Sequence, residues 1–225
     1  AVWLVLWRLR LPLDALDQNA QLNLTPAQQQ AIDQLVQQRI GTRKPAAYLT
    51  GEAWLHGVPF DVDERVIVPR SLIAEPLLDG TLDAWVQPGL LQVLDLCTGN
   101  CSLAILAAMT WPGAVVDAAD ISAPALTVAQ KNLTRHGMST RIELFEGDGL
   151  LAIGSRAYDV ILCNPPYVNA APLAALPAEF LAEPTLALAG GLDAVIVLDV
   201  AFVMAGVASL LAAWRQFSRS ALVPS

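Results

Sequence analysis

The strongest constraint on the fold is a regular alternation of short apolar runs with helical segments that begins near residue 91. Four runs have the length and composition of buried strands: 91–96, 114–119, 141–146 and 158–163. Helix-forming residues at 103–109 separate the first two runs, and Ser122 begins a second helix with Pro124 in its first turn. Strands that alternate with helices at this spacing predict a doubly wound α/β domain with a mostly parallel sheet.

The first 50 residues are predicted to form a separate helical domain. Thr25 is followed by Pro26 and Gln28, a pattern in which Thr25 caps a helix and Gln28 completes a capping box. Apolar residues then recur at helical spacing until Gly41, where the helix is expected to stop.

Residues 51–88 are predicted to connect this helical domain to the α/β domain. Apolar residues alternate with polar or small ones from Trp54 to Val62, and a β-branched run follows at 66–68. This pattern favours a hairpin or an extended linker, followed by a short connecting helix. The predicted organisation is therefore a helical domain (1–50), a hairpin linker (51–88) and an α/β domain (89–225).

Charge and cysteine content narrow the classes of function. The net charge is −8, so the chain has no long-range attraction for phosphate backbones, and a basic protein suits it better as a partner.

The spacing of Cys97, Cys101 and Cys163 predicts reduced cytoplasmic thiols and no metal site. The apolar run at 195–214 is long enough to be considered as a membrane span, but it contains Asp199. Placing an aspartate at the centre of a bilayer costs about 2.5–3.5 kcal/mol. The β-branched start of the run, at 195–198, is predicted to form a buried strand, and no membrane partner is expected.

Polar residues follow three of the predicted strands, where ligands bind in folds of this kind. The loop from Cys97 to Cys101 contains Gly99, which lets the backbone approach a ligand closely. Asp120 ends the next strand, where an acidic residue binds ribose hydroxyls in dinucleotide folds. The segment 146–149 places carboxylates and glycines where an adenine amino group would fit. Each feature alone also fits an ordinary turn or helix cap, but together they predict a nucleoside cofactor.

The tetrapeptide Asn164-Pro165-Pro166-Tyr167 follows the fourth predicted strand. Its two prolines fix the backbone and lack N–H donors, so the carbonyl oxygens are left to accept hydrogen bonds. The Asn164 side chain adds an acceptor, and the Tyr167 ring adds a flat surface. This combination predicts a site for a planar –NH2 group, either a side-chain amide or the amine of a base.

The order of these motifs resembles the class I S-adenosylmethionine (SAM)-dependent methyltransferases, which have a Rossmann-like sheet. More narrowly, the chain is similar to the HemK-type protein glutamine N5-methyltransferases. Segments 47–54 and 62–71 resemble the branch that methylates a glutamine of ribosomal protein L-three of the large subunit. The resemblance extends from about Leu6 to Gly191. It implies a SAM-dependent enzyme that acts on a basic ribosomal protein in the cytoplasm.

The resemblance also implies roles by position. The implied SAM contacts are Cys97, Thr98, Gly99, Asn100, Cys101, Asp120 at the ribose, Asp148 and Gly149 beside the adenine, and Asn164. The implied substrate contacts are Asn164, Pro165, Pro166, Tyr167 and Arg70, with Asn164, Pro165 and Tyr167 forming the catalytic group. The family usually has glycine at position 101, so the Cys101 side chain is expected to crowd the methionine part of SAM.

Two other functions stay open from the residues alone. An adenine N6-methyltransferase acting on nucleic acid would use the same tetrapeptide on a flipped base. The acidic charge and the lack of an obvious basic recognition segment argue against it. A non-catalytic adaptor of the same fold would result if Cys101 had abolished cofactor binding, and a SAM-binding measurement separates that case.

Overall fold

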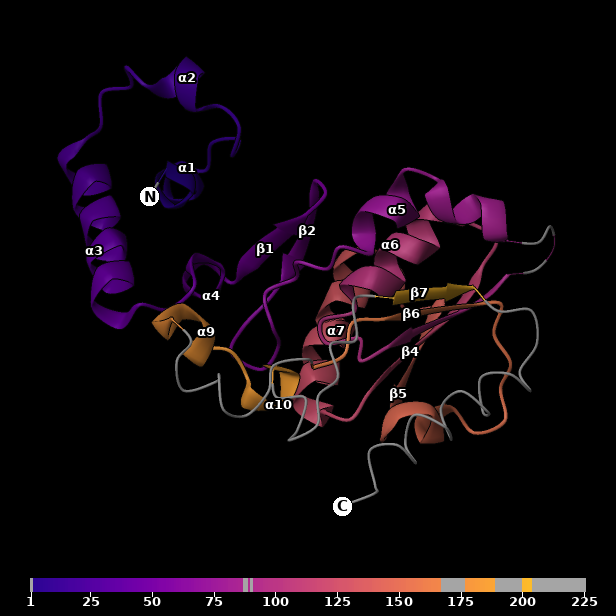
Figure 1. Cartoon of the computed structure of the whole chain (residues 1–225). Helices are drawn as coiled ribbons and strands as arrows, with labels where there is room; N and C mark the ends of the chain where they lie inside the picture. Colours follow the sequence, from indigo (N-terminus) through magenta and orange to yellow (C-terminus); the bar gives the residue numbers. More distant parts are fainter. Residues whose placement is uncertain (1, 87–88, 90, 167–176, 189–199, 204–225) are drawn as a thin grey trace.

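The computed structural model describes residues 2–86, 89, 91–166, 177–188 and 200–203 of the chain (Figure 1). Tyr167 and most of the apolar run at 195–214 lie outside these ranges. Within them, no helix is long and apolar enough to cross a membrane.

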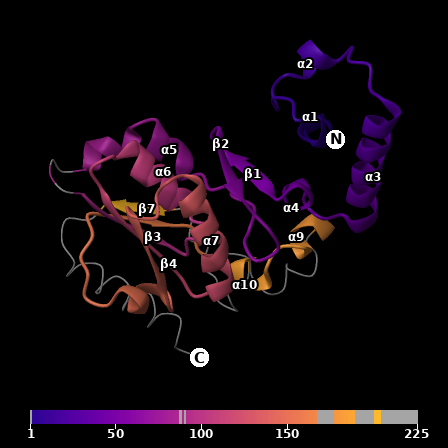
Figure 2. The same cartoon turned by 180° about the vertical axis from the view of Figure 1, so that it is seen from behind.

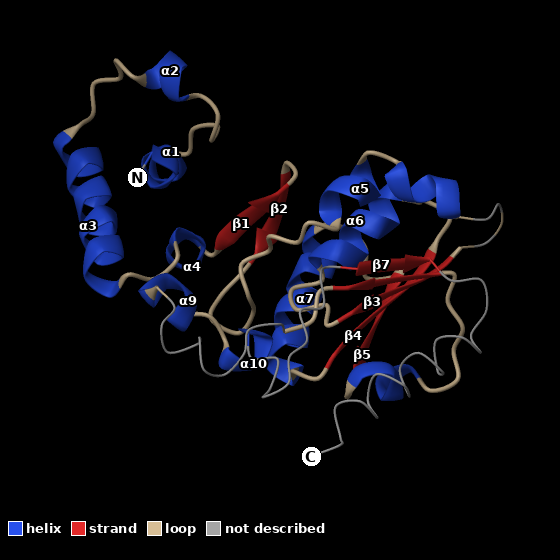
Figure 3. Ribbon diagram, viewed as in Figure 1, coloured by secondary structure: helices blue, strands red, loops and turns tan. Residues whose placement is uncertain are grey.

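A five-stranded sheet forms the centre of the α/β part (Figure 3). Its strands are β3 (Gln92–Leu96), β4 (Val115–Asp120), β5 (Ile142–Glu146), β6 (Val160–Cys163) and β7 (Val200–Val203). They lie in the order β5-β4-β3-β6-β7; the first four are parallel, and β7 runs antiparallel to β6. The predicted α/β class with a mostly parallel sheet is confirmed.

Helices cover the sheet on both faces. Helices α5 (Ala74–Leu78), α6 (Ser102–Thr110) and α7 (Ala123–Arg135) contribute to the main hydrophobic core with one face of the sheet. The short 3-10 helix η2 (Gly149–Ile153) packs on the other face. Helix α6 is buried from Ser102 to Ala108, because it lies between the sheet and neighbouring helices. The predicted cap of α7 is confirmed, since the Ala125 N–H donates to the Ser122 hydroxyl.

The N-terminal part consists of helices, as predicted, and lies beyond the hairpin from the sheet (Figures 1 and 2). Its helices are α1 (Val2–Leu9), α2 (Leu16–Asn19), α3 (Pro26–Thr42) and α4 (Ala46–Thr50). The capping box of α3 is present, with Gln28 N–H donating to the Thr25 hydroxyl. The predicted stop at Gly41 is wrong. The helix continues to Thr42, and Arg43 takes the left-handed conformation and donates its N–H to the Arg39 carbonyl.

The linker contains a hairpin of β1 (Glu52–Leu55) and β2 (Val58–Asp61), which pair in antiparallel register. Residues His56 and Gly57 both have positive φ, the geometry of a tight two-residue hairpin turn. The run at 66–68 is outside any strand, because the chain turns where Val66 N–H donates to the Asp63 carbonyl. A 3-10 helix η1 (Thr81–Trp85) follows α5. The domain boundaries at residues 50 and 88 remain predictions.

Between the acceptor motif and β7, the described residues 177–188 contain the short helices α9 (Ala178–Leu181) and α10 (Thr185–Leu188). In both views α9 lies beside α4, near the C-terminal end of α3 (Figures 1 and 2). The chain thus returns to the N-terminal helices after it leaves β6.

Candidate cofactor and acceptor site

The predicted site residues follow parallel strands that end at one edge of the sheet. Leu96, the last residue of β3, is in register with Ala119 of β4 and with Cys163 of β6. Asp120 of β4 is in register with Glu146 of β5. The loop after β3, Asp120, the segment after β5 and the motif after β6 are therefore brought together. Tyr167 lies outside the described residues, so its place in the site is untested.

The Cys97–Cys101 loop has a defined backbone conformation. Its residues Cys97, Gly99 and Cys101 all have left-handed φ, at 61°, 57° and 69°. The Thr98 N–H donates to the Ala119 carbonyl at 3.0 Å, and the Cys101 N–H donates to the Thr98 carbonyl at 2.9 Å. Left-handed φ costs free energy at the two cysteines, so these surrounding bonds are what maintain the loop.

Asp95 fixes the loop to the start of α6. It is buried inside β3, and its Oδ2 accepts from the Thr98 hydroxyl at 2.5 Å and the Ala104 N–H at 3.0 Å. Burial raises the pKa of Asp95 to about 7, although both hydrogen bonds act in the opposite direction. Sequence reasoning gave Asp95 no role. The available signal was an acidic residue within an otherwise apolar strand.

Asp120 connects the loop to the neighbouring strand. Its Oδ2 accepts from the Gly99 N–H at 2.8 Å, and its Oδ1 accepts from the Ser122 N–H at 2.9 Å. A carboxylate has about four acceptor positions, so two such bonds leave capacity for hydroxyl donors. This geometry is compatible with the predicted ribose role, and the bond from the Gly99 N–H adds an attachment of the loop that the sequence had not indicated.

Asn100 supplies a test of whether the loop suits a bound group. The residue is buried, and its carbonyl accepts a 2.9 Å hydrogen bond from Asn132 Nδ2. Its own Nδ2 is also buried and has no hydrogen-bond partner among the described residues. A buried donor without an acceptor is costly, so a ligand that presents an acceptor here would be favoured.

The Cys101 side chain lies in the protein core. It is fully buried among apolar residues of α6 and the sheet, and burial, followed by the nearby Asp95, raises the pKa of its thiol. A side chain directed into the core does not line an open site. Its inward packing argues against the expected crowding of SAM, which stays an untested prediction.

The segment after β5 approaches its neighbours closely. The Gly147 N–H donates to the Asp120 carbonyl at 3.1 Å. A Cβ added at Gly147 would lie 2.9 Å from the Ala152 Cβ and 3.0 Å from its Cα, which no side chain tolerates without movement. Asp148 then precedes Gly149, the first residue of η2. This segment, predicted to border the adenine, follows Glu146, the register partner of Asp120.

The acceptor motif begins directly after β6. Asn164, Pro165 and Pro166 are all partly buried. The Asn164 side chain forms no hydrogen bond with another residue in the described ranges. Proline has no N–H donor, and the role of the Pro165 and Pro166 carbonyls as acceptors stays a prediction.

Arg70, predicted to contact substrate, instead pairs with a side chain that follows the acceptor motif. It donates to both carboxylate oxygens of Glu183 at 2.7 Å, and its guanidinium lies 4.9 Å from the Phe180 ring centroid. Whether it also touches substrate stays a prediction. Sequence reasoning missed Glu183, because no local pattern links it to Arg70.

A second acidic residue connects the same segment to the N-terminal helices. Glu179 accepts hydrogen bonds from Arg39 at 2.9 Å and from Arg43 at 2.8 and 3.0 Å. These bonds, from Arg43 first, lower the pKa of Glu179 to about 2. The segment after the acceptor motif is therefore bonded both to α3 and to the linker.

Comparisons with known proteins agree with this architecture. The family model of the methyltransferase small domain matches residues 80–206. The ribosomal protein uL3 glutamine methyltransferase of Bordetella pertussis is 52% identical over 195 residues, covering 86% of this chain and 65% of that protein. Its counterpart in Burkholderia pseudomallei is 50% identical over 202 residues, covering 86% and 66%. That in Bradyrhizobium diazoefficiens is 47% identical over 201 residues, covering 86% and 63%.

The chain thus spans slightly less than two thirds of the length of these curated relatives. The family match covers the sheet, the Cys97–Cys101 loop and the acceptor motif. On this evidence the chain belongs to the methyltransferase small domain family.

Proposed function

We propose that this chain transfers a methyl group from SAM to the side-chain amide nitrogen (N5) of a glutamine in ribosomal protein uL3. The observation that carries the proposal is the adjacency of two loops. Leu96 and Cys163 are register partners, so the Cys97–Cys101 loop and Asn164 leave neighbouring strands side by side. The relatives, whose names specify uL3 glutamine methylation, support this substrate.

In this proposal SAM occupies the loops at the carboxyl edge of the sheet. Its proposed contacts are Cys97, Thr98, Gly99, Asn100, Cys101, Asp120, Asp148, Gly149 and Asn164. When bound, SAM supplies a methyl group already activated by its sulfonium. The buried Nδ2 of Asn100 has no hydrogen-bond partner in the described part of the chain, and Asp120 retains acceptor capacity, so the two suit a ligand that has both acceptors and hydroxyl donors.

The acceptor motif is proposed to act by orientation. An amide nitrogen is a weak nucleophile, because its lone pair is delocalised into the carbonyl group. Asn164 Oδ1 and the Pro165 carbonyl would each accept one N–H of the glutamine amide, directing the nitrogen toward the methyl group. Such positioning lowers the barrier without a general base. Pro166 and Tyr167 complete the proposed surface beside the amide.

The acidic chain also suits its proposed partner. A net charge of −8 favours encounter with a basic ribosomal protein over a phosphate backbone. The proposal places the reaction in the cytoplasm, and it assigns Arg70 to the substrate side through its contact with the segment after the motif.

The direct test is transfer of labelled methyl from SAM to purified uL3, with DNA and RNA as parallel substrates and mass spectrometry to locate the modified residue. We expect label on a glutamine of uL3 only. Label confined to nucleic acid would contradict the proposal and favour an adenine N6-methyltransferase. Absence of SAM binding by calorimetry would favour a non-catalytic adaptor.

A matched pair of variants tests the role of Asn164. Asn164→Ala is expected to abolish transfer while the Kd for SAM changes less than about threefold, because the variant loses the side-chain acceptor proposed for the glutamine amide and keeps the backbone of residue 164 for the proposed SAM contact. Gln130→Ala, a change at an exposed position of α7, serves as the control and should retain transfer. Transfer by Asn164→Ala at the unmodified rate would show that another group orients the amide.

A further inference from the structure

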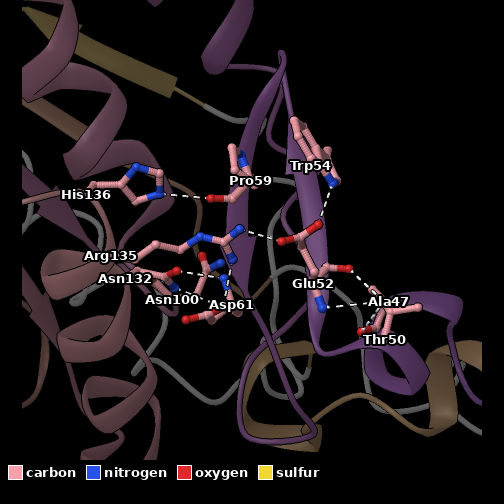
Figure 4. Close-up of polar contacts among 10 residues, drawn as sticks. All are labelled: Ala47, Thr50, Glu52, Trp54, Pro59, Asp61, Asn100, Asn132, Arg135 and His136. Atoms are coloured by element: carbon pink, nitrogen blue, oxygen red, sulfur yellow. Dashed lines mark hydrogen bonds and ion pairs between the residues drawn. The ribbon is translucent and has the colours of Figure 1, made fainter. Parts of the chain in front are cut away.

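The Asn132 side chain on α7 connects two parts of the molecule that are far apart in the sequence. Its Oδ1 accepts from the Asp61 N–H at 2.7 Å, and its Nδ2 donates to the Asp61 carbonyl at 3.0 Å (Figure 4). The same Nδ2 donates to the Asn100 carbonyl at 2.9 Å. One amide thus bonds to the backbone of hairpin strand β2 and of the Cys97–Cys101 loop.

We propose that Asn132 is a positioning residue that couples the hairpin β1–β2 to the cofactor loop. Order in the loop then stabilises the hairpin, and order in the hairpin stabilises the loop. The inference rests on the proposed function for the identity of the ligand that binds the loop.

Burial makes these bonds effective. Asn132 is fully buried, and both donors and the acceptor of its amide are used by the three bonds to Asp61 and Asn100. Hydrogen bonds away from water are stronger and more directional than exposed ones, and a lost partner there leaves a costly unpaired group. A shift of Asn100 on ligand binding is therefore transmitted to Asp61 through a single rigid side chain.

Two neighbours of Asn132 provide a comparison, because they contact the hairpin and not the loop. Arg135 pairs with Asp61 at 2.7 Å and with Glu52. The ring Nε2 of His136 lies 2.8 Å from the Pro59 carbonyl oxygen, to which it donates (Figure 4). Arg135 and His136 attach the hairpin to the end of α7. Of these three side chains, Asn132 is the one that also reaches the loop.

Through this coupling the hairpin affects the affinity of the Cys97–Cys101 loop for its ligand. Asn100 belongs to the loop proposed to hold SAM, and its buried Nδ2 is the group whose pairing would change on binding. Thermodynamic linkage makes this coupling reciprocal. If ligand binding stabilises the ordered hairpin by a given free energy, then the ordered hairpin stabilises the bound ligand by the same free energy. Trp54 on β1 is 45% exposed, so the hairpin presents an aromatic side chain while Asn132 joins its strand β2 to the cofactor loop.

The first test uses the unmodified chain and S-adenosylhomocysteine as the probe. Amide hydrogen exchange is measured across residues 52–62 with and without saturating probe. We expect exchange at the Asp61 amide, whose N–H donates to Asn132, to slow by at least threefold. Binding with unchanged exchange in the hairpin would overturn the coupling and leave the proposed function intact. No binding at all would overturn both.

The second test compares variants of α7. Asn132→Asp retains an acceptor for the Asp61 N–H and removes both donated bonds. We expect it to raise the KM for SAM about tenfold, with kcat at saturating SAM within twofold of the unmodified chain. Arg135→Ala loosens the hairpin but leaves the three Asn132 bonds in place, so it should raise the KM for SAM by clearly less than the tenfold expected for Asn132→Asp. Gln130→Ala, on the exposed face of the same helix, is the control.

A merely structural Asn132 would give a different pattern. Its loss would lower the melting temperature and the yield of active protein, with an unchanged KM for SAM in the folded fraction. That result, or equal effects of Asn132→Asp and Arg135→Ala on this KM, would overturn the proposal. If Asn132→Asp does not fold, the exchange measurement on the unmodified chain decides.

Discussion

Arg70 donates hydrogen bonds to both carboxylate oxygens of Glu183, each at 2.7 Å. The Glu183 side chain is only 3% exposed, whereas that of Arg70 is 35% exposed. The pair joins the linker to the segment after the acceptor motif, across 113 positions of sequence. The acceptor motif is thus followed by a segment fixed to a part of the chain that precedes the whole α/β sheet.

Arg70→Ala is expected to destabilise the protein by about 3 kcal/mol, because it leaves the Glu183 carboxylate buried without its counter-charge. Urea unfolding measures the change. Arg70→Ala combined with Glu183→Leu should recover much of the loss, since the unpaired charge is removed. Arg43→Ala is the control: its side chain is 58% exposed, so the loss should be below about 1 kcal/mol. If Arg70→Ala and Arg43→Ala lowered the free energy of unfolding equally, burial of the Glu183 carboxylate would not be the cause of the larger effect expected for Arg70→Ala.

Asp95 is expected to make stability fall as pH rises. Burial raises its folded-state pKa to about 7, above the unfolded value of about 3.9. Between about pH 3.9 and pH 7 the Asp95 carboxyl is therefore protonated in the folded chain and ionised in the unfolded chain. The free energy of unfolding consequently decreases as pH rises through this window. The stability that is lost through Asp95 reaches its full value above about pH 7, and none is lost below about pH 4.

The measurement compares the unmodified chain with Asp95→Asn, which does not titrate at this position. Free energies of unfolding from urea titrations at pH 4.5, 6 and 8 should show the unmodified chain losing about 3 kcal/mol relative to the variant between pH 4.5 and pH 8. A difference that stays constant with pH would mean that Asp95 keeps an ordinary pKa.

Gly147→Ala is expected to cost about 1–3 kcal/mol, because the new Cβ would lie 2.9 Å from the Ala152 Cβ and force local movement. Thermal unfolding measures the cost. Gly154→Ala is the comparison variant. Gly154 also has a positive φ, but no atom lies within 4 Å of an added Cβ, so this variant measures the cost of backbone strain without a steric clash. A smaller loss at Gly147 than at Gly154 would show that the close approach is relieved easily.

Cys101→Gly is expected to change the Kd for SAM less than about threefold. The side chain is fully buried in the core and does not line the site, so its removal opens no space for the ligand. Calorimetric titration of both proteins provides the comparison. A tenfold gain in affinity for the variant would restore the view that this cysteine crowds the cofactor.

Local patterns predicted the parts of the fold that local physics controls. The Thr25 and Ser122 caps follow from short-range hydrogen bonding, and both are present. The convergence of Asp120 and Asn164 at one edge followed from parallel pairing, since the carboxyl ends of parallel strands meet. These features depend on residues a few positions apart or on a general property of the sheet.

The features that sequence reasoning missed depend on contacts between distant residues. Glu179 and Glu183 bond to arginines more than 100 positions earlier, so no window of sequence contains both partners. The inward direction of the Cys101 side chain is set by the packing of α6 against the sheet. The bonds from Asn132 to Asp61 and Asn100 arise only when α7, the hairpin and the loop are already assembled.

The hydrogen bonds that define the Cys97–Cys101 loop also bear on when the site appears during folding. Its attachments to Ala119 and Asp120 cross from β3 to β4, and its attachment to Asn132 requires α7 to be docked. Formation of the loop must therefore wait for non-local pairing, the slow part of folding in parallel sheets. A ligand of this loop selects the assembled chain over its unfolded forms. At one hundred times its Kd, it would add about 2.7 kcal/mol to global stability.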